Sequence, residues 1–135
     1  MSRTMLLIAL TAATPSVWAQ QPLCRADGNQ QEMNQCAFDA LGEADAQLNA
    51  TYTKVLASLE HDPLARERVK AAQRLWLQLR DADLAAQFPL AEGKDPRMQY
   101  GSIYPLEHAD AQADLTRQRT DYLRRQFLAP LRDKR

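Results

Sequence analysis

Apolar residues recur at steps of three and four between residues 33 and 59. This spacing puts them on one face and predicts a long amphipathic helix. Asn29, followed three residues later by Glu32, is a favourable pair for capping its first turn. Small residues along this helix leave a smooth surface that another helix can approach closely. They are Ala37, Ala40, Gly42 and Ala44.

A second helical pattern begins after a short break. Asp62 and Pro63 combine a favoured N-cap residue with a favoured first helical residue. One apolar stripe is expected along this helix. It contains Val69, Ala72, Trp76, Leu79 and Asp83, with Leu75 and Ala82 beside it. Because two long helices joined by a short break usually fold back on each other, we expect an antiparallel hairpin.

Helical spacing is lost after Phe88 and returns from Ala109 to Phe127. Prolines and glycines interrupt the stretch between them, at Pro89, Gly93, Pro96, Gly101 and Pro105. A loop of this length is uncommon in a small domain, and such loops often carry function. The expected fold is all-α. A long antiparallel hairpin carries a third helix packed across it, with a long irregular loop before that helix and one disulfide.

The first residues have the pattern of a secretory signal peptide. Arg3 precedes an apolar run at residues 5–13, and Val17 and Ala19 occupy the −3 and −1 positions of a cleavage site. The run is far shorter than the roughly 20 residues that span a bilayer, so no membrane insertion is expected after cleavage. We expect a signal peptide at 1–19, one helical domain at 20–129, a basic tail at 130–135, and a periplasmic or secreted location.

The two cysteines are Cys24 and Cys36. Export places them where disulfides persist, and a bond between them would hold the irregular N-terminal segment against the first helix. A structural disulfide is therefore expected. Two cysteines without neighbouring histidines do not make a zinc site, and their spacing is not the Cys-x-x-Cys of redox enzymes.

Charge is balanced over the chain but uneven along it. Lys and Arg number 17, as do Asp and Glu, so composition indicates no nucleic-acid partner. Acids outnumber bases between residues 20 and 63, and bases outnumber acids between residues 117 and 135. We expect these oppositely charged helices to dock on each other within one domain. The alternative is an external acidic or basic partner.

No catalytic or metal-binding constellation is visible in the sequence. His61 and His108 are the only histidines, and neither has a metal-ligand partner three or four residues away. Asp81 and Asp83 form an acidic pair, but on a charged helix face where solvation is the simplest explanation. We therefore expect no enzymatic activity, no cofactor and no metal. The alternative is a hydrolase whose acids converge only in three dimensions.

Several polar residues lie on or beside the apolar stripes. Together with Trp76, the expected structural network contains Asp45, Asn49, Arg80, Asp81, Thr116 and Arg119. Arg80 follows Trp76 by about one turn, so the two side chains share a face. Because a buried arginine is costly unless it is paired, we expect Arg80 to bind Asp45, Asn49 or Asp81. Such a network more often fixes the register of helices than binds a ligand.

Four groups of short segments occur in an order typical of one family. The helical ones are Glu-Met-Asn-Gln-Cys-Ala at 32–37, Leu-Asn-x-x-Tyr at 48–52, Ala-Gln-Arg-Leu-Trp at 72–76, Arg-Asp-Ala at 80–82 and Leu-Thr-x-x-Arg at 115–119. The loop contributes Gly-Ser-x-Tyr-Pro at 101–105. These segments resemble the LprI-like lysozyme-inhibitor domain of the bacterial envelope, and the resemblance extends from Cys24 to about Phe127.

The chain departs from that family pattern at two positions. Relatives commonly carry one cysteine after the Arg-Asp segment and another before the final Leu-Thr, where this chain has Leu84 and Ala111. If those two cysteines bond to each other in relatives, this chain has lost both partners of one disulfide. Cys24 and Cys36 are then the remaining pair. The loop at 88–105 should therefore be less tethered here than in relatives.

The resemblance implies an envelope binding protein that inhibits lysozyme. The alternative is a non-catalytic envelope interaction or assembly module that docks another protein on the smooth face of the first helix. For inhibition, we expect the loop to make the contact, because aromatic and cationic side chains suit an acidic, sugar-binding cleft. The candidate partner-binding residues are Lys94, Tyr100, Ser102 and Tyr104. Neither the type of lysozyme nor the oligomeric state follows from the sequence.

Overall fold

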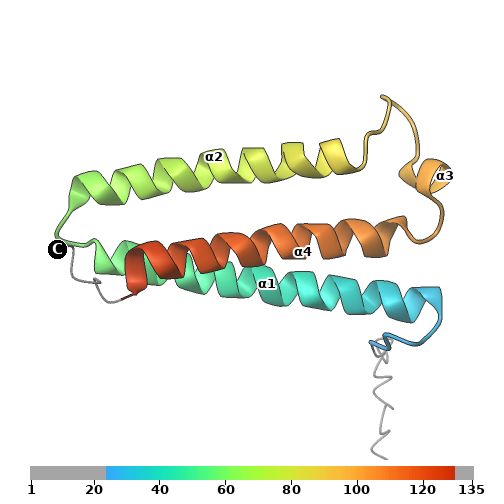
Figure 1. The fold of residues 1–135 in the computed structure, drawn as a ribbon, viewed down its shortest axis with the longest axis horizontal. Coiled ribbons are helices and arrows are strands. Elements are labelled where there is room, and N and C mark those ends of the chain that lie inside the picture. The colour runs from blue at the N-terminus through green and yellow to red at the C-terminus, as the bar shows by residue number, and fades with distance from the viewer. Residues whose placement is uncertain (1–23, 130–135) are drawn as a thin grey trace, which may run out of the picture.

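The computed structural model describes residues 24–129, and these residues form helices and connecting segments without any strand. The elements are α1 (Gln30–Ser58), α2 (Pro63–Gln87), α3 (Pro96–Tyr100), α4 (Tyr104–Leu123) and a turn of π-helix, η1 (Arg124–Leu128) (Figure 1). The predicted all-α class is confirmed. The expected signal peptide at 1–19 and the basic tail at 130–135 lie outside the described residues.

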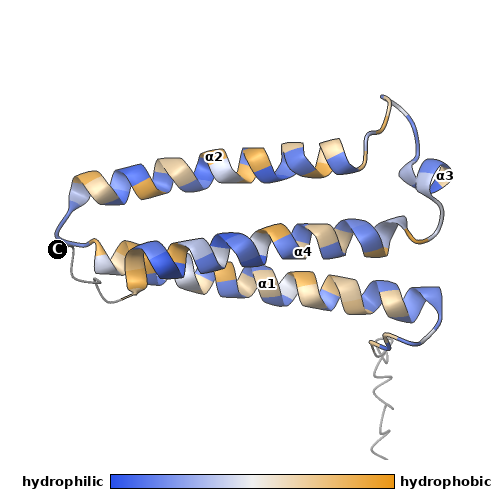
Figure 2. Cartoon of the chain, in the orientation of Figure 1, coloured by the Kyte–Doolittle hydropathy of each residue, from blue (hydrophilic) through white to orange (hydrophobic). Residues whose placement is uncertain are grey.

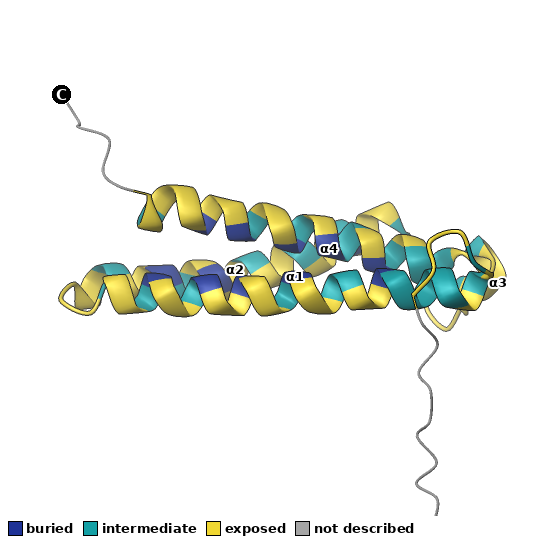
Figure 3. Ribbon diagram, turned by 90° about the horizontal axis from the view of Figure 1, so that it is seen from below, coloured by how far each residue is buried: buried dark blue, intermediate teal, exposed yellow. Residues whose placement is uncertain are grey.

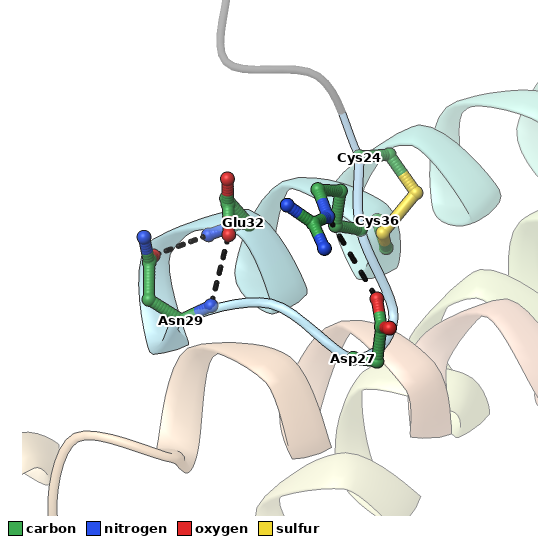
Figure 4. A network of polar contacts seen from close by, with 6 residues as sticks. Cys24, Asp27, Asn29, Glu32 and Cys36 are labelled. Atoms are coloured by element: carbon green, nitrogen blue, oxygen red, sulfur yellow. Dashed lines mark hydrogen bonds and ion pairs between the residues drawn. A yellow bond between two sulfur atoms is a disulfide. The ribbon is translucent and has the colours of Figure 1, made fainter.

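The start of α1 is fixed by the predicted capping pair and by the disulfide (Figure 4). The side chain of Asn29 accepts hydrogen bonds from the backbone N–H groups of Gln31 and Glu32, at 3.0 and 3.1 Å. The carboxylate of Glu32 accepts the N–H of Asn29 at 2.9 Å, which completes a capping box. A disulfide joins Cys24 to Cys36, so the segment before α1 is bonded to the second turn of the helix.

α2 begins as the sequence predicts. Asp62 is the N-cap, and its carboxylate accepts the backbone N–H of Ala65 at 2.9 Å, while Pro63 is the first helical residue. The helix returns alongside α1 in the opposite direction, which confirms the antiparallel order of the first two helices (Figure 1).

The closest helix pair is α1 with α4, which run side by side in the same direction (Figure 1). α4 therefore lies along α1 rather than across the hairpin, and α2 makes much less contact with either helix. Small buried side chains explain this, because Ala37 and Ala44 of α1 and Ala109 and Ala113 of α4 let the backbones approach closely. Two residues of the predicted smooth surface, Ala37 and Ala44, are thus covered by α4, whereas Gly42 is exposed. Figure 3 shows buried residues on the facing sides of these two helices.

The hydrophobic core lies toward the end at which α1 and α4 finish. Leu48 and Val55 of α1, Val69 of α2 and Leu123 of α4 form its buried centre. Five partly buried residues pack around this centre: Tyr52, Leu56, Leu59, Trp76 and Phe127. The core thus draws on all three long helices, and α2 contributes only one fully buried apolar residue to it.

The buried face of α2 differs from the predicted stripe. Its buried residues are Val69, Gln73 and Leu84, with Trp76 half-buried between them. Leu79, expected on the same stripe as Val69 and Trp76, is 57% exposed, and Ala72 is exposed as well. Apolar residues recur along the whole length of α2 (Figure 2), so hydropathy alone did not distinguish the covered face from the open one.

The last long helix begins earlier than predicted. Helical spacing indicated a start at Ala109, whereas α4 begins at Tyr104 and has Pro105 in its first turn. Proline is well tolerated there because the first N–H groups of a helix have no partner within it. The irregular loop is correspondingly shorter, and it contains the single-turn helix α3.

The expected docking of an acidic helix on a basic one is wrong. Because α1 and α4 run in the same direction, the acidic first half of α1 lies beside the first half of α4 (Figure 1). That part of α4 carries Glu107, Asp110 and Asp114 and is itself acidic. Like charges therefore gather at one end of the bundle, instead of cancelling across the helix pair.

Candidate partner-binding end

An aromatic cluster holds the segment that joins α2 to α4. It consists of Phe88 after α2, Tyr100 of α3, and Tyr104 and His108 of α4. Phe88 makes T-shaped contacts with Tyr100 and Tyr104 at centroid distances of 5.9 and 5.6 Å, and the two tyrosines stack at 5.7 Å. His108 lies 5.5 Å from Phe88 and 5.4 Å from Tyr104. Edge and offset ring contacts of this kind are favourable, so the cluster ties the loop to both long helices.

Hydrogen bonds brace the same segment. The hydroxyl of Tyr100 donates to the backbone carbonyl of Pro89, and the side-chain amide of Gln99 donates to the same carbonyl at 2.9 Å. Asp95 caps α3 by accepting the N–H of Arg97 at 2.8 Å. Gly101 ends α3 with a φ of +81°, a conformation that glycine adopts without strain. The loop therefore has a defined shape.

The four candidate loop residues fall into two groups. Lys94 and Ser102 are exposed, whereas Tyr100 and Tyr104 are half-buried, with their rings inside the aromatic cluster. The most open apolar side chain of the loop is Met98 on α3, which is 87% exposed. The two tyrosines therefore support the loop from inside, and Lys94, Arg97 and Met98 form its exposed surface. We call Lys94, Arg97 and Met98 the α3 tip.

A hollow of about 450 Å³ lies beside the α3 tip, between α1, α3 and α4. Its lining residues are Phe38, Asp95, Pro96, Arg97, Tyr104, Pro105 and His108. Phe38 is half exposed, so an apolar surface from α1 borders the hollow. Nothing in the sequence pattern placed Phe38 beside the loop, because it comes from a helix far from the loop in the sequence.

The expected structural network forms only in part. Arg80 pairs with Asp81 on its own helix at 2.9 Å, and its guanidinium lies over the ring of Trp76 at 5.5 Å. The link between helices comes instead from Arg119 of α4, which donates to the side chain of Gln73 at 3.0 Å. Arg119 also lies over Trp76 at 5.7 Å, and burial lowers the pKa of its guanidinium. Sequence reasoning missed Gln73, because an amide on a helix gives no sign that it is buried.

The other predicted members of this network stand apart from those contacts. Asp45 and Asn49 line a cleft of about 370 Å³ between α1 and α2, and Arg80 lines the opposite wall. Thr116 is fully buried in α4, and its hydroxyl has no hydrogen-bond partner among the described residues. The structure thus brings Trp76, Arg80, Asp81 and Arg119 together. Asp45, Asn49 and Thr116 take no part in the contacts among those four residues.

Within residues 24–129, no group of three His, Cys, Asp or Glu side chains is arranged to hold a metal ion. His61 lies in the turn between α1 and α2, 3.2 Å from Glu60, and His108 belongs to the aromatic cluster. None of the helices described for this part of the chain is long and apolar enough to cross a membrane.

Charge is segregated along the long axis of the bundle. Residues 24–47 and 78–114, at the end that carries α3, contain twelve acidic and four basic residues, a net charge of −8. Residues 48–77 and 115–129, toward the other end, contain nine basic and four acidic residues, a net charge of +5. We call these halves the acidic end and the basic end. A partner at the α3 tip therefore approaches a strongly acidic surface.

Comparison with known proteins identifies the family. The family model of the lysozyme inhibitor LprI matches residues 24–123, which include all four helices and the disulfide. The chain belongs to the LprI family. An uncharacterised protein of Rhizobium meliloti (strain 1021) is similar to this LprI-family chain, with 33% identity over 131 residues that cover 87% of this chain and 89% of the relative. No solved structure matches it.

Family membership accounts for several features described above. The disulfide and the family together suggest a protein that works outside the cytoplasm. The two positions where the resemblance implies further cysteines in relatives, Leu84 and Ala111, lie on α2 and α4 of this chain. Leu84 is buried, so this LprI-family chain has an apolar side chain where a sulfur would otherwise lie.

Proposed function

We propose that this LprI-family protein is an exported, non-catalytic inhibitor of lysozyme that binds through its acidic end. The observation that carries the proposal is the match of the lysozyme-inhibitor family to nearly all of the described chain. The α3 tip is the proposed contact. Lys94, Arg97 and Met98 would enter the substrate cleft of the enzyme, and Ser102 would lie at the edge of the contact.

The shape of the loop supports this use of the α3 tip. A segment that must order itself on binding loses affinity, whereas a segment already held in shape does not. Here Tyr100 and Tyr104 hold the loop through the aromatic cluster, and Tyr100 also holds it through the hydrogen bond from its hydroxyl to the carbonyl of Pro89. Their proposed role is therefore to support the tip, while the exposed residues make the contact.

Charge supports binding through the α3 tip both at short range and at long range. Lysozymes act through carboxylates in a sugar-binding cleft, which the ammonium of Lys94 and the guanidinium of Arg97 complement at short range. Around them, the acidic end would attract a lysozyme of net positive charge at long range. The proposal therefore favours basic lysozymes as targets over acidic ones.

The alternative function, an envelope interaction or assembly module, loses the surface that the sequence suggested for it. Ala37 and Ala44 are buried against α4 and are not available to another protein. An assembly role would need a different face, and the exposed leucines of α2 offer one.

The test is inhibition of cell-wall clearing by lysozymes of several types, with the mature protein titrated to stoichiometry. Replacing Lys94, Arg97 and Met98 together with alanine should abolish inhibition of the sensitive enzyme without changing the helical circular dichroism. A matched control replaces three exposed residues at the far end: Lys54, Arg66 and Leu128. Equal inhibition by the two triple variants would reject the α3 tip as the contact. Absence of inhibition by the folded wild-type protein would reject the function for the enzymes tested.

A further inference from the structure

The outward side of α2 carries an apolar stripe that nothing in the described chain covers. Its members are Leu64, Ala72, Leu75, Leu79, Ala82 and Ala86, and Arg68 lies within it. Successive members are three, four or eight residues apart, so they fall on one face of the helix. Leu64 and Leu75 are 68% and 65% exposed. We call this surface the outer stripe.

The outer stripe is unusual for a helix that is otherwise so weakly packed. α2 buries only three residues against the rest of the bundle, while it leaves three leucines of the outer stripe open to solvent. A contiguous exposed apolar surface of this kind usually marks an interface. Covering it would also give α2 the packing that α1 and α4 obtain from each other.

The charges along α2 indicate which partner covers the stripe. Its first half carries Arg66, Arg68, Lys70 and Arg74 against one acid, Glu67. Lys70 pairs with Glu67 at 2.7 Å, and Lys70 and Arg74 line the cleft toward α1, so Arg68 is the base that lies within the outer stripe. Its second half carries Asp81 and Asp83, and the guanidinium of its one base, Arg80, is bonded to Asp81. A second α2 placed antiparallel to the first therefore brings a basic half against an acidic half twice, whereas a parallel α2 would bring like charges together.

The rest of the molecule has the same polarity. α2 runs from the basic end to the acidic end, so an antiparallel neighbour places its net charge of +5 beside the net charge of −8, and the reverse. A surface that is complementary to itself under a two-fold rotation is the basis of a symmetric dimer. The outer stripe indicates an interface, and the charge pattern points to a second copy of this chain as the partner.

We infer that two copies form a two-fold dimer through the outer stripes of their α2 helices, with the axis near Leu75. In this register the two Leu75 side chains meet, and Leu79 packs on Ala72 of the other copy. Arg68 then lies opposite Asp83 of the other copy, at both ends of the contact. The α3 tips point away from the interface at opposite ends of the dimer, so each remains free to bind.

Sedimentation velocity of the mature protein tests the inference first. We expect a reversible dimer whose dissociation constant rises with salt, because two sets of opposite charges face each other. Replacing Leu75 and Leu79 together with glutamate should give a folded monomer. Met98→Glu, which also adds a charge at an exposed apolar position, should leave the dimer unchanged. A wild-type monomer at every concentration up to about 1 mM would overturn the inference, and so would a dimer that the double variant leaves intact.

A charge exchange tests the antiparallel register. Arg68→Glu and Asp83→Arg should each raise the dissociation constant about tenfold, and the two changes together should restore it, because the pair is re-formed with its signs reversed. Asp83→Asn takes the place of the arginine variant if that protein fails to fold. If neither single substitution changed the dissociation constant of the dimer, or if the combined variant dimerised more weakly than both single variants, this register would be excluded. The interface substitutions, at Arg68, Leu75, Leu79 and Asp83, leave the α3 tip unchanged, so loss of the dimer and loss of lysozyme inhibition can be separated.

Discussion

At the scale of single residues, threonines stand out inside the α1–α4 interface. Thr51 of α1 and Thr116 and Thr120 of α4 are buried there. The hydroxyl of Thr120 donates to the backbone carbonyl of Thr116 at 3.0 Å, whereas the hydroxyl of Thr116 has no partner among the described residues. A buried polar group without a partner costs stability, since it gives up its bonds to water on folding.

Thr116→Val should therefore stabilise the protein. Valine has nearly the shape of threonine and lacks the hydroxyl, so we expect the free energy of unfolding to rise by about 1 kcal/mol. Thr120→Val is the matched control. It removes a hydroxyl that is hydrogen-bonded, and should be neutral or destabilising. Urea denaturation followed by circular dichroism measures both, and a loss of stability in Thr116→Val would show that this hydroxyl is satisfied in solution.

At the scale of elements, the starts of the first two helices followed from local chemistry, whereas the start of α4 and the covered face of α2 did not. The capping box at Asn29 and the Asp62–Pro63 start were predictable because each depends on neighbours within a few residues. The covered face of α2 was not predictable, because apolar residues occur on two of its sides and only the position of the other helices decides between them. The aromatic cluster escaped prediction for the same reason, since its rings come from three separate segments.

The disulfide should stabilise the start of α1. Closing the loop between Cys24 and Cys36 is worth about 3 kcal/mol in the chain-entropy model, so replacing both cysteines with serine should lower the free energy of unfolding by up to that amount. Reduction of the wild-type protein gives the same comparison without mutation. If only the amides before α1 exchanged faster, with global stability unchanged, the bond would be holding a segment that unfolds independently.

At the scale of the whole molecule, the separation of charge could not be derived from the sequence alone. The acidic first half of α1 lies beside the acidic first half of α4 when the two helices run in the same direction, and would lie beside its basic second half if they ran in opposite directions. The direction of α4 depends on where the segment after Phe88 leads the chain, and local patterns do not encode that. The all-α fold and the disulfide depended on no such choice, and both were predicted correctly.

If the acidic end recruits a basic lysozyme, the association rate should depend strongly on ionic strength. We expect it to fall by at least tenfold between low and physiological salt, while the dissociation rate changes little. Surface plasmon resonance with immobilised lysozyme measures both rates. Glu92→Gln together with Asp110→Asn, two exposed positions at the acidic end, should flatten the dependence. If only the dissociation rate changed with ionic strength, the charges would instead act within the bound complex.

The pairing of α1 with α4 also determines when this chain can fold. Val55 and Leu123 belong to one buried cluster, yet all of α2 and the loop lie between them in the sequence. Contacts between such distant segments form late and slow the search for the native state. The first two helices have few contacts with each other, so little holds them together before α4 has been synthesised. This protein is expected to cross a membrane as an extended chain. Late folding would keep it unfolded, and so competent for export, until its last helix has been synthesised.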